Sequence, residues 1–187
     1  MMRRRDLFVA GAGVCSLLTS GSNLLAEETT AWGSAVGGLR LGLRLDSLSQ
    51  GNLFVFLENR GPAPLELFVS FVDVQRFELT ATAPGGKEYS VADALMYRPC
   101  AGLCGLPFTE YLNPGASRKS TYALEKLRLV PSKGQYVPLR PLLQQGYFVR
   151  AFFEVTEQQL KEVKLSLENP WLGRIVSGEI RLAQLNG

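Results

Sequence analysis

The chain has 187 residues, of which 46% are hydrophobic, 20% charged and 10% aromatic, and its formal net charge is +3. This composition is too apolar for a disordered chain, and the length suits one folded domain. The sequence contains no histidine, which excludes Ser-His-Asp and Cys-His catalysis, histidine-ligated zinc or copper, and any imidazole general base.

Residues 1–26 are typical of an export signal, with three arginines at 3–5, a short apolar stretch at 7–18, and cleavage expected at the end of the segment. The apolar stretch is too short to span a bilayer well. Arg4-Arg5-Asp6-Leu7-Phe8 resembles a twin-arginine signal, and the Sec route is the alternative. We therefore expect a periplasmic or secreted protein, with no stable membrane insertion after signal cleavage and a mature domain over residues 27–187.

The mature chain has a period of two nearly everywhere, which is typical of β-strands. Apolar and polar residues alternate over Leu39–Asp46, and Leu53–Leu57 is a continuous apolar run that suits a central strand. Further strands are expected over residues 65–71, 77–82, 118–124, 147–155 and 176–182. With turn signals between most of them, this pattern predicts a single all-β domain, an antiparallel sandwich of about seven strands.

Helix is expected in two short places. Thr156 and Gln159 form a capping-box pattern, which predicts a helix from Glu157 to about Lys164. Apolar residues after this point also alternate as a strand would, so the helix has a competing interpretation. Residues 138–145 are expected to hold a second helical turn, which ends at Gly146.

Cys100 and Cys104 are the two cysteines left after signal cleavage. In an oxidising compartment they are expected to form a disulfide that closes a tight loop. The alternative is half of a zinc site, but the chain lacks a second cysteine pair and histidine to complete it. The sequence therefore predicts no metal and no cofactor. The nearly neutral mature chain also lacks the charge expected of a protein that binds nucleic acid.

The segment 93–114 is the most distinctive part of the chain, because it is long for a connection and rich in aromatic residues. It has two interpretations. It is either a rigid binding loop or a cap that buries its apolar side chains over the end of the sandwich. As a binding loop, its candidate contact residues are Tyr97, Arg98, Phe108, Glu110 and Tyr111.

No pattern in the sequence indicates catalysis. The acidic residues are scattered, mostly at strand positions expected to face solvent: Asp46, Glu58, Glu66, Glu78 and Glu154. They do not form the pair that a glycosidase needs, and the common nucleophile and nucleotide motifs are absent. Trp32 and Trp171 are expected to pack over the core, with sugar stacking as the alternative.

Three stretches carry a resemblance to a known family: Trp32-Gly33 leading into residues 38–43, residues 56–65, and residues 146–151. The second contains an N-x-G-x-x-P-L junction between two strands, and the third resembles the entry to a penultimate strand. Together with residues 171–182 as the last strand, they resemble the small immunoglobulin-like sandwiches common among exported bacterial proteins. This resemblance implies an immunoglobulin-like architecture and no particular activity.

From these features we expect an exported, non-catalytic interaction or accessory module that recognises a protein or polymer of the bacterial cell envelope. The first alternative is a proteinase inhibitor that presents the 93–114 loop. The second is a carbohydrate-binding module that uses Tyr97, Tyr111 or Trp171.

Overall fold

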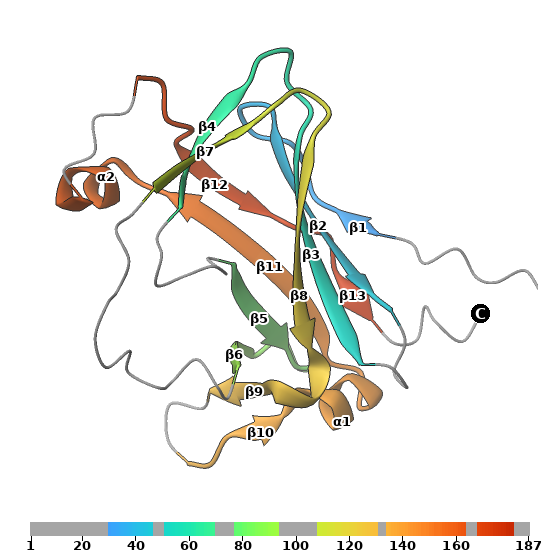
Figure 1. The fold of residues 1–187 in the computed structure, drawn as a ribbon. Coiled ribbons are helices and arrows are strands. Elements are labelled where there is room, and N and C mark those ends of the chain that lie inside the picture. Colours follow the sequence, from blue (N-terminus) through green and yellow to red (C-terminus); the bar gives the residue numbers. More distant parts are fainter. Residues whose placement is uncertain are drawn as a thin grey trace, which may run out of the picture.

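The structure is a computed structural model that describes residues 30–46, 51–69, 77–93, 108–130, 134–163 and 168–181. These residues are mostly strand, arranged in antiparallel sheets with short helical segments between them (Figure 1). The prediction of a β-rich, antiparallel chain is therefore confirmed.

The first sheet has the strand order β1-β2-β3-β8, and each neighbouring pair is antiparallel. Its strands are β1 (Ala31–Trp32), β2 (Leu39–Leu45), β3 (Asn52–Asn59) and β8 (Ser117–Ala123). Successive side chains of a strand point to opposite faces. The leucines at every second position of β2 are at most 3% exposed, as the period of two predicted.

Trp32 packs on the outer face of this sheet. A Cβ atom on Gly42 would lie 2.6 Å from the Cε3 atom of Trp32, so the indole ring rests on the bare backbone of the glycine. The ring centroid of Phe56 is 6.1 Å away, and the guanidinium carbon of Arg40 lies 3.9 Å from the indole centroid. The arginine position is a cation–π contact. Trp32 therefore has a structural role, but the prediction that it packs over the core is wrong, because its ring lies on the face of the first sheet that points away from the core.

The second sheet has the order β10-β9-β6-β5-β11-β12, and β13 also pairs with β11. Its strands are β5 (Glu78–Thr82), β6 (Glu88–Asp93), β9 (Leu127–Val130), β10 (Val137–Pro138), β11 (Phe148–Val155), β12 (Gly173–Val176) and β13 (Ile180–Arg181). The expected single strand over 176–182 is wrong. The hydroxyl of Ser177 accepts a hydrogen bond from the amide of Ala151 (2.9 Å), and this contact lies where the regular pairing with β11 is interrupted between the end of β12 and the start of β13.

A third, two-stranded sheet pairs β4 (Leu65–Val69) with β7 (Phe108–Leu112), and these strands extend beyond β3 and β8 (Figure 1). β7 lies inside the segment 93–114, which the sequence predicted to be a loop throughout. That prediction is wrong for its last part, because Phe108–Leu112 finds backbone partners on β4. A local pattern does not reveal a partner strand about 40 residues earlier in the chain.

Asn59 joins this two-stranded sheet to the first one. Its side chain is fully buried, and its amide nitrogen donates to the carbonyl oxygens of Ala63 and Leu112, each at 2.8 Å. Its amide oxygen accepts a hydrogen bond from the backbone N–H of Gly61, also at 2.8 Å. The asparagine of the N-x-G-x-x-P-L junction thus holds the turn after β3 and the end of β7 together.

Both expected helices are present. α2 (Glu157–Val163) starts with the predicted capping box, in which the N–H of Thr156 donates to the Gln159 side chain at 2.8 Å and the N–H of Gln159 donates to the Thr156 hydroxyl at 3.3 Å. α1 (Leu139–Gln144) buries Leu139 and Leu143, which are four residues apart and so lie on one face. No helix in the described ranges has the length and apolar character needed to cross a membrane.

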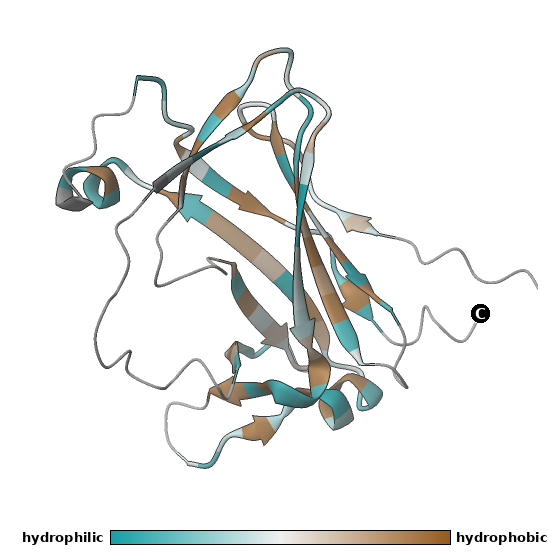
Figure 2. Ribbon diagram, in the orientation of Figure 1, coloured by the Kyte–Doolittle hydropathy of each residue, from teal (hydrophilic) through white to brown (hydrophobic). Residues whose placement is uncertain are grey.

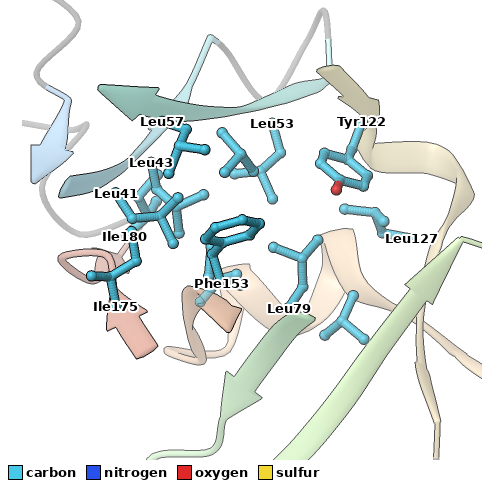
Figure 3. Packing of buried hydrophobic residues seen from close by; sticks show 14 of the residues in the cluster. Leu41, Leu43, Leu53, Leu57, Leu79, Tyr122, Leu127, Phe153, Ile175 and Ile180 are labelled. Carbon is cyan, nitrogen blue, oxygen red and sulfur yellow. The ribbon is translucent and has the colours of Figure 1, made fainter. Parts of the chain in front are cut away.

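The core lies between the first and second sheets. β2 lies close to β11, β12 and β13, and β8 passes through η2 (Leu124–Lys126) into β9 of the second sheet. Figure 3 shows leucines of the first sheet facing Phe153, Leu79 and Ile175 of the second. In Figure 2 the apolar residues are concentrated on these strands, whereas α2 is largely hydrophilic. Burial of this apolar surface is the main stabilising contribution to such a fold.

Candidate functional site

Tyr111 on β7 is the most prominent exposed aromatic residue of the described chain. Its side chain is 62% exposed, more than any other large apolar or aromatic side chain in the described ranges. The neighbouring Leu112 is buried in the core. This alternation follows from the strand conformation of β7, which directs successive side chains to opposite faces. The cap interpretation of the 93–114 segment therefore does not hold for Tyr111, because this side chain is not buried.

The hydroxyl of Tyr111 donates a hydrogen bond to Glu66 Oε1, at 3.2 Å. The two residues lie directly opposite each other on β7 and β4. The second carboxylate oxygen, Oε2, accepts a hydrogen bond from the backbone N–H of Asn169, at 3.3 Å. Glu66 thus fixes the phenol end of Tyr111 and leaves much of its ring accessible.

The sequence predicted Glu66 as a solvent-facing strand residue, and that prediction is wrong, because its side chain is only 7% exposed. The segment around Pro170 covers the outer side of β4. Pro170 forms a parallel bridge with Glu66, and the N–H of Trp171 donates to the Glu66 carbonyl oxygen at 2.9 Å. The alternating pattern of β4 gives no sign that a segment about 100 residues later covers it.

Trp171 anchors the covering segment in the core. It is 5% exposed, its ring stacks on Phe153 with centroids 5.6 Å apart, and its indole N–H donates to the carbonyl oxygen of Val36 at 3.1 Å. The structural interpretation of Trp171 is confirmed, and its buried ring is not available for stacking on a sugar. The Glu66 carboxylate therefore lies against a firmly packed part of the protein.

The electrostatic environment of Tyr111 is negative. The charge of Glu66 raises the pKa of the Tyr111 hydroxyl above its ordinary value of 10.0. The hydrogen bond to Glu66, desolvation and the charge of the exposed Glu168 shift this pKa in the same direction. We refer to the exposed ring of Tyr111, together with the carboxylates of Glu66 and Glu168, as the Tyr111 surface.

Replacing Glu66 with glutamine is expected to lower the pKa of Tyr111 relative to the wild-type protein. The substitution removes the largest contribution to the shift, because ionising the phenol would no longer place two negative charges side by side. NMR titration of protein labelled with ¹³C at tyrosine Cζ measures this pKa, and Tyr111→Phe identifies the resonance. Glu78→Gln, which removes an exposed carboxylate on β5, is expected to leave it unchanged. An equal pKa in Glu66→Gln and wild type would contradict the assignment.

The structure does not bring Glu110 to the Tyr111 surface. As the preceding residue of β7, it faces the other side of the strand, and its carboxylate forms an ion pair with Arg118 at 2.5 Å. Phe108 pairs with Val69 at the start of β7 through its backbone. The predicted site residues Tyr97 and Arg98 and the predicted disulfide cysteines Cys100 and Cys104 lie outside the described residues.

Sequence reasoning missed the acidic half of the surface. Glu66 was assigned to solvent, and neither Glu168 nor Asn169 was singled out. Asn169 contributes only its backbone N–H, so its residue type carries no signal. Within the described ranges, no group of three or more histidine, cysteine or acidic residues is placed to hold a metal ion.

No protein-family model matches the chain, and no curated protein matches it at a significant level.

Proposed function

We propose that this chain is an exported, non-catalytic binding module that recognises a protein or polymer of the bacterial cell envelope through the Tyr111 surface. The observation that carries the proposal is the combination of a ring that is 62% exposed and a hydroxyl held by Glu66. An exposed aromatic side chain offers a large contact area. Because its position is already fixed, binding costs less conformational entropy.

We also infer that the sheets form an immunoglobulin-like sandwich. In this assignment β2, β3 and β8 correspond to strands A, B and E, and β5, β11 and β12 correspond to C, F and G, with β6 as C′. The pairing of β3 with β8 and of β5 with β11 supports it, since B–E and C–F are neighbouring pairs in such domains. The ends of these sandwiches commonly carry binding surfaces, and β4 and β7 extend from one end.

Export is proposed from residues 1–26, with the charged start and apolar stretch described above. The non-catalytic assignment is supported by the complete lack of histidine and by the state of Glu66. Both oxygens of its carboxylate accept hydrogen bonds from the protein itself. A carboxylate held in this way is suited to positioning Tyr111, whereas a general base needs an oxygen directed at a substrate proton.

The proteinase-inhibitor alternative depends on the 93–114 loop, of which residues 94–107 lie outside the described ranges. For the carbohydrate-binding alternative, Trp171 is not available as a stacking residue because its ring is buried, whereas Tyr111 is exposed and remains a candidate. No specific observation favours either alternative, and the interaction module remains the proposed function.

Cosedimentation of the mature protein with isolated cell envelopes of the source bacterium tests this function. Wild-type protein is expected to bind saturably, and Tyr111→Ala is expected to weaken binding at least about fivefold, as for a central aromatic residue of an interface. Tyr136→Ala is the matched control, because Tyr136 is also a strongly exposed tyrosine (54%) and lies on a different segment, next to β10. It is expected to bind like wild type. Failure of the wild type to bind, or equal binding by Tyr111→Ala, would contradict the proposal.

A further inference from the structure

We propose that the Tyr111 surface binds a lysine or arginine side chain of a partner polypeptide, with the cation over the Tyr111 ring and close to Glu168. This inference rests on the proposed function, and it adds the chemical class of the group that is bound.

The exposed ring of Tyr111 is suited to binding a cation. The face of an aromatic ring carries partial negative charge and attracts a cation within about 6 Å of its centroid. The Tyr111 hydroxyl donates to a carboxylate at 3.2 Å, which draws negative charge toward the phenol and strengthens this attraction. Because the hydroxyl is engaged on the protein side, the exposed part of the side chain that meets a ligand is the ring itself.

The negative charge beside Tyr111 is not balanced by an ion pair among the described residues. Several other acidic side chains of the described chain pair with an arginine of the protein: Glu58 with Arg40, Glu110 with Arg118, Glu154 with Arg174 and Glu179 with Arg150. In the described part of the chain, no lysine or arginine nitrogen lies within 4.0 Å of a carboxylate oxygen of Glu66 or Glu168. The raised pKa of Tyr111 reports the resulting negative potential. A cationic ligand would supply the positive charge that Glu66 and Glu168 do not find among the described residues.

The chemistry of the Tyr111 surface suits an organic cation and not a metal ion. Both oxygens of Glu66 already accept hydrogen bonds from an O–H and an N–H donor, so this carboxylate is engaged by the protein. The ring of Tyr111 supplies a π face and no ligand atom. An ammonium or guanidinium group needs only such a face and a nearby carboxylate, whereas calcium requires about six to eight oxygen ligands.

The free edge of β7 favours a polypeptide over an amino sugar as the ligand. Among the described strands, β7 pairs only with β4, and its other edge has no strand partner. An open edge presents backbone N–H and C=O groups that an extended peptide can pair with. Alternate side chains of a peptide on this edge would point to the face that carries Tyr111.

NMR titration of the mature protein with an acetylated, amidated tetralysine peptide tests this inference. The peptide is expected to shift the ring resonance of Tyr111 and backbone amides of β4 and β7 saturably, whereas a tetraglutamate peptide does not. Glu168→Gln is expected to weaken tetralysine binding about threefold, through loss of an exposed ion pair beside the cation–π contact. Glu78→Gln changes the net charge equally at an exposed site on β5, which does not contribute to the pKa shift of Tyr111, and is expected to leave the affinity unchanged.

Several results would overturn the inference: tetralysine that leaves the Tyr111 ring unshifted, equal effects of Glu168→Gln and Glu78→Gln, or tighter binding of a chitosan tetramer than of tetralysine. Tyr111→Ala, followed through the backbone amides, is expected to weaken tetralysine binding further than Glu168→Gln. If the envelopes retain the protein in a Tyr111-dependent way and tetralysine does not bind, this inference fails alone. If tetralysine binds and the envelopes do not retain the protein, the proposed function fails alone.

Discussion

Replacing Gly33 with alanine is expected to lower the free energy of unfolding by about 3 kcal/mol. Gly33 follows β1 at the place where this segment crosses from the first sheet to the second. A Cβ atom at this position would lie 1.7 Å from the carbonyl oxygen of Val176 and 2.8 Å from its carbonyl carbon. These are backbone atoms, so no side-chain rotation relieves the clash.

The segment cannot simply move away from Val176. The N–H of Gly33 donates to the Leu41 carbonyl oxygen at 2.8 Å, and the Ala31 carbonyl oxygen accepts from the N–H of Gly178 at 3.1 Å. A shift large enough for the methyl group breaks these hydrogen bonds and lifts Trp32 from its place on Gly42. The expected loss therefore combines the clash with the contacts of β1.

Urea unfolding followed by circular dichroism measures this effect. Gly85→Ala is the matched control, because a Cβ atom on Gly85 meets nothing within 4 Å. This control is expected to stay within about 0.5 kcal/mol of wild type, as for an ordinary surface substitution. A Gly33→Ala variant as stable as Gly85→Ala would show that β1 does not close against residues 176–178.

Replacing Asn59 with aspartate is expected to destabilise the fold by about 3 kcal/mol or more at pH 7. The change is nearly isosteric, but it replaces the amide nitrogen with an oxygen that faces the carbonyl oxygens of Ala63 and Leu112. Two hydrogen bonds become two repulsive contacts in a fully buried site. The turn between β3 and β4 and the turn between β7 and β8 both depend on this side chain.

The loss is expected to be smaller at pH 5 than at pH 7. Burial and the two carbonyl oxygens favour the protonated form of the introduced carboxyl, so its pKa in the folded state rises above its unfolded value. The penalty is then present above the folded-state pKa and is relieved as the pH falls through it, because the protonated acid can donate to one carbonyl oxygen. Wild-type protein at each pH is the reference.

Asn113→Asp makes the same chemical change at an exposed turn residue, and it is expected to have little effect at either pH. Chemical denaturation of both variants provides the comparison. Equal stabilities of Asn59→Asp and Asn113→Asp would contradict the structural role given to Asn59.

The elements that the sequence predicted well are those whose signal is local. The alternating leucines of β2 define its buried face, and the capping box of Thr156 and Gln159 fixes the start of α2, because both patterns arise within one or two turns or pleats of the chain. The division of the last predicted strand into β12 and β13 has no such local signal. It depends on the Ser177 hydroxyl, which takes the place of a backbone partner for Ala151 on another strand.

The candidate site was predicted in part, for the same reason. Tyr111 was identified from its residue type and its place in a distinctive segment. Glu66 was misplaced because a period of two assigns residues to faces but does not say what covers each face. Its cover comes from Asn169, 103 positions later in the chain, and involves a backbone N–H that every residue except proline offers.

The affinity of the Tyr111→Ala variant for isolated envelopes, measured beside that of Tyr136→Ala, tests the central claim most directly. We expect Tyr111→Ala to bind at least about fivefold more weakly than Tyr136→Ala, while circular dichroism shows that both variants are folded under the binding conditions. Equal affinities of the two variants would show that the exposed, hydrogen-bonded tyrosine on β7 is not where this protein meets its partner.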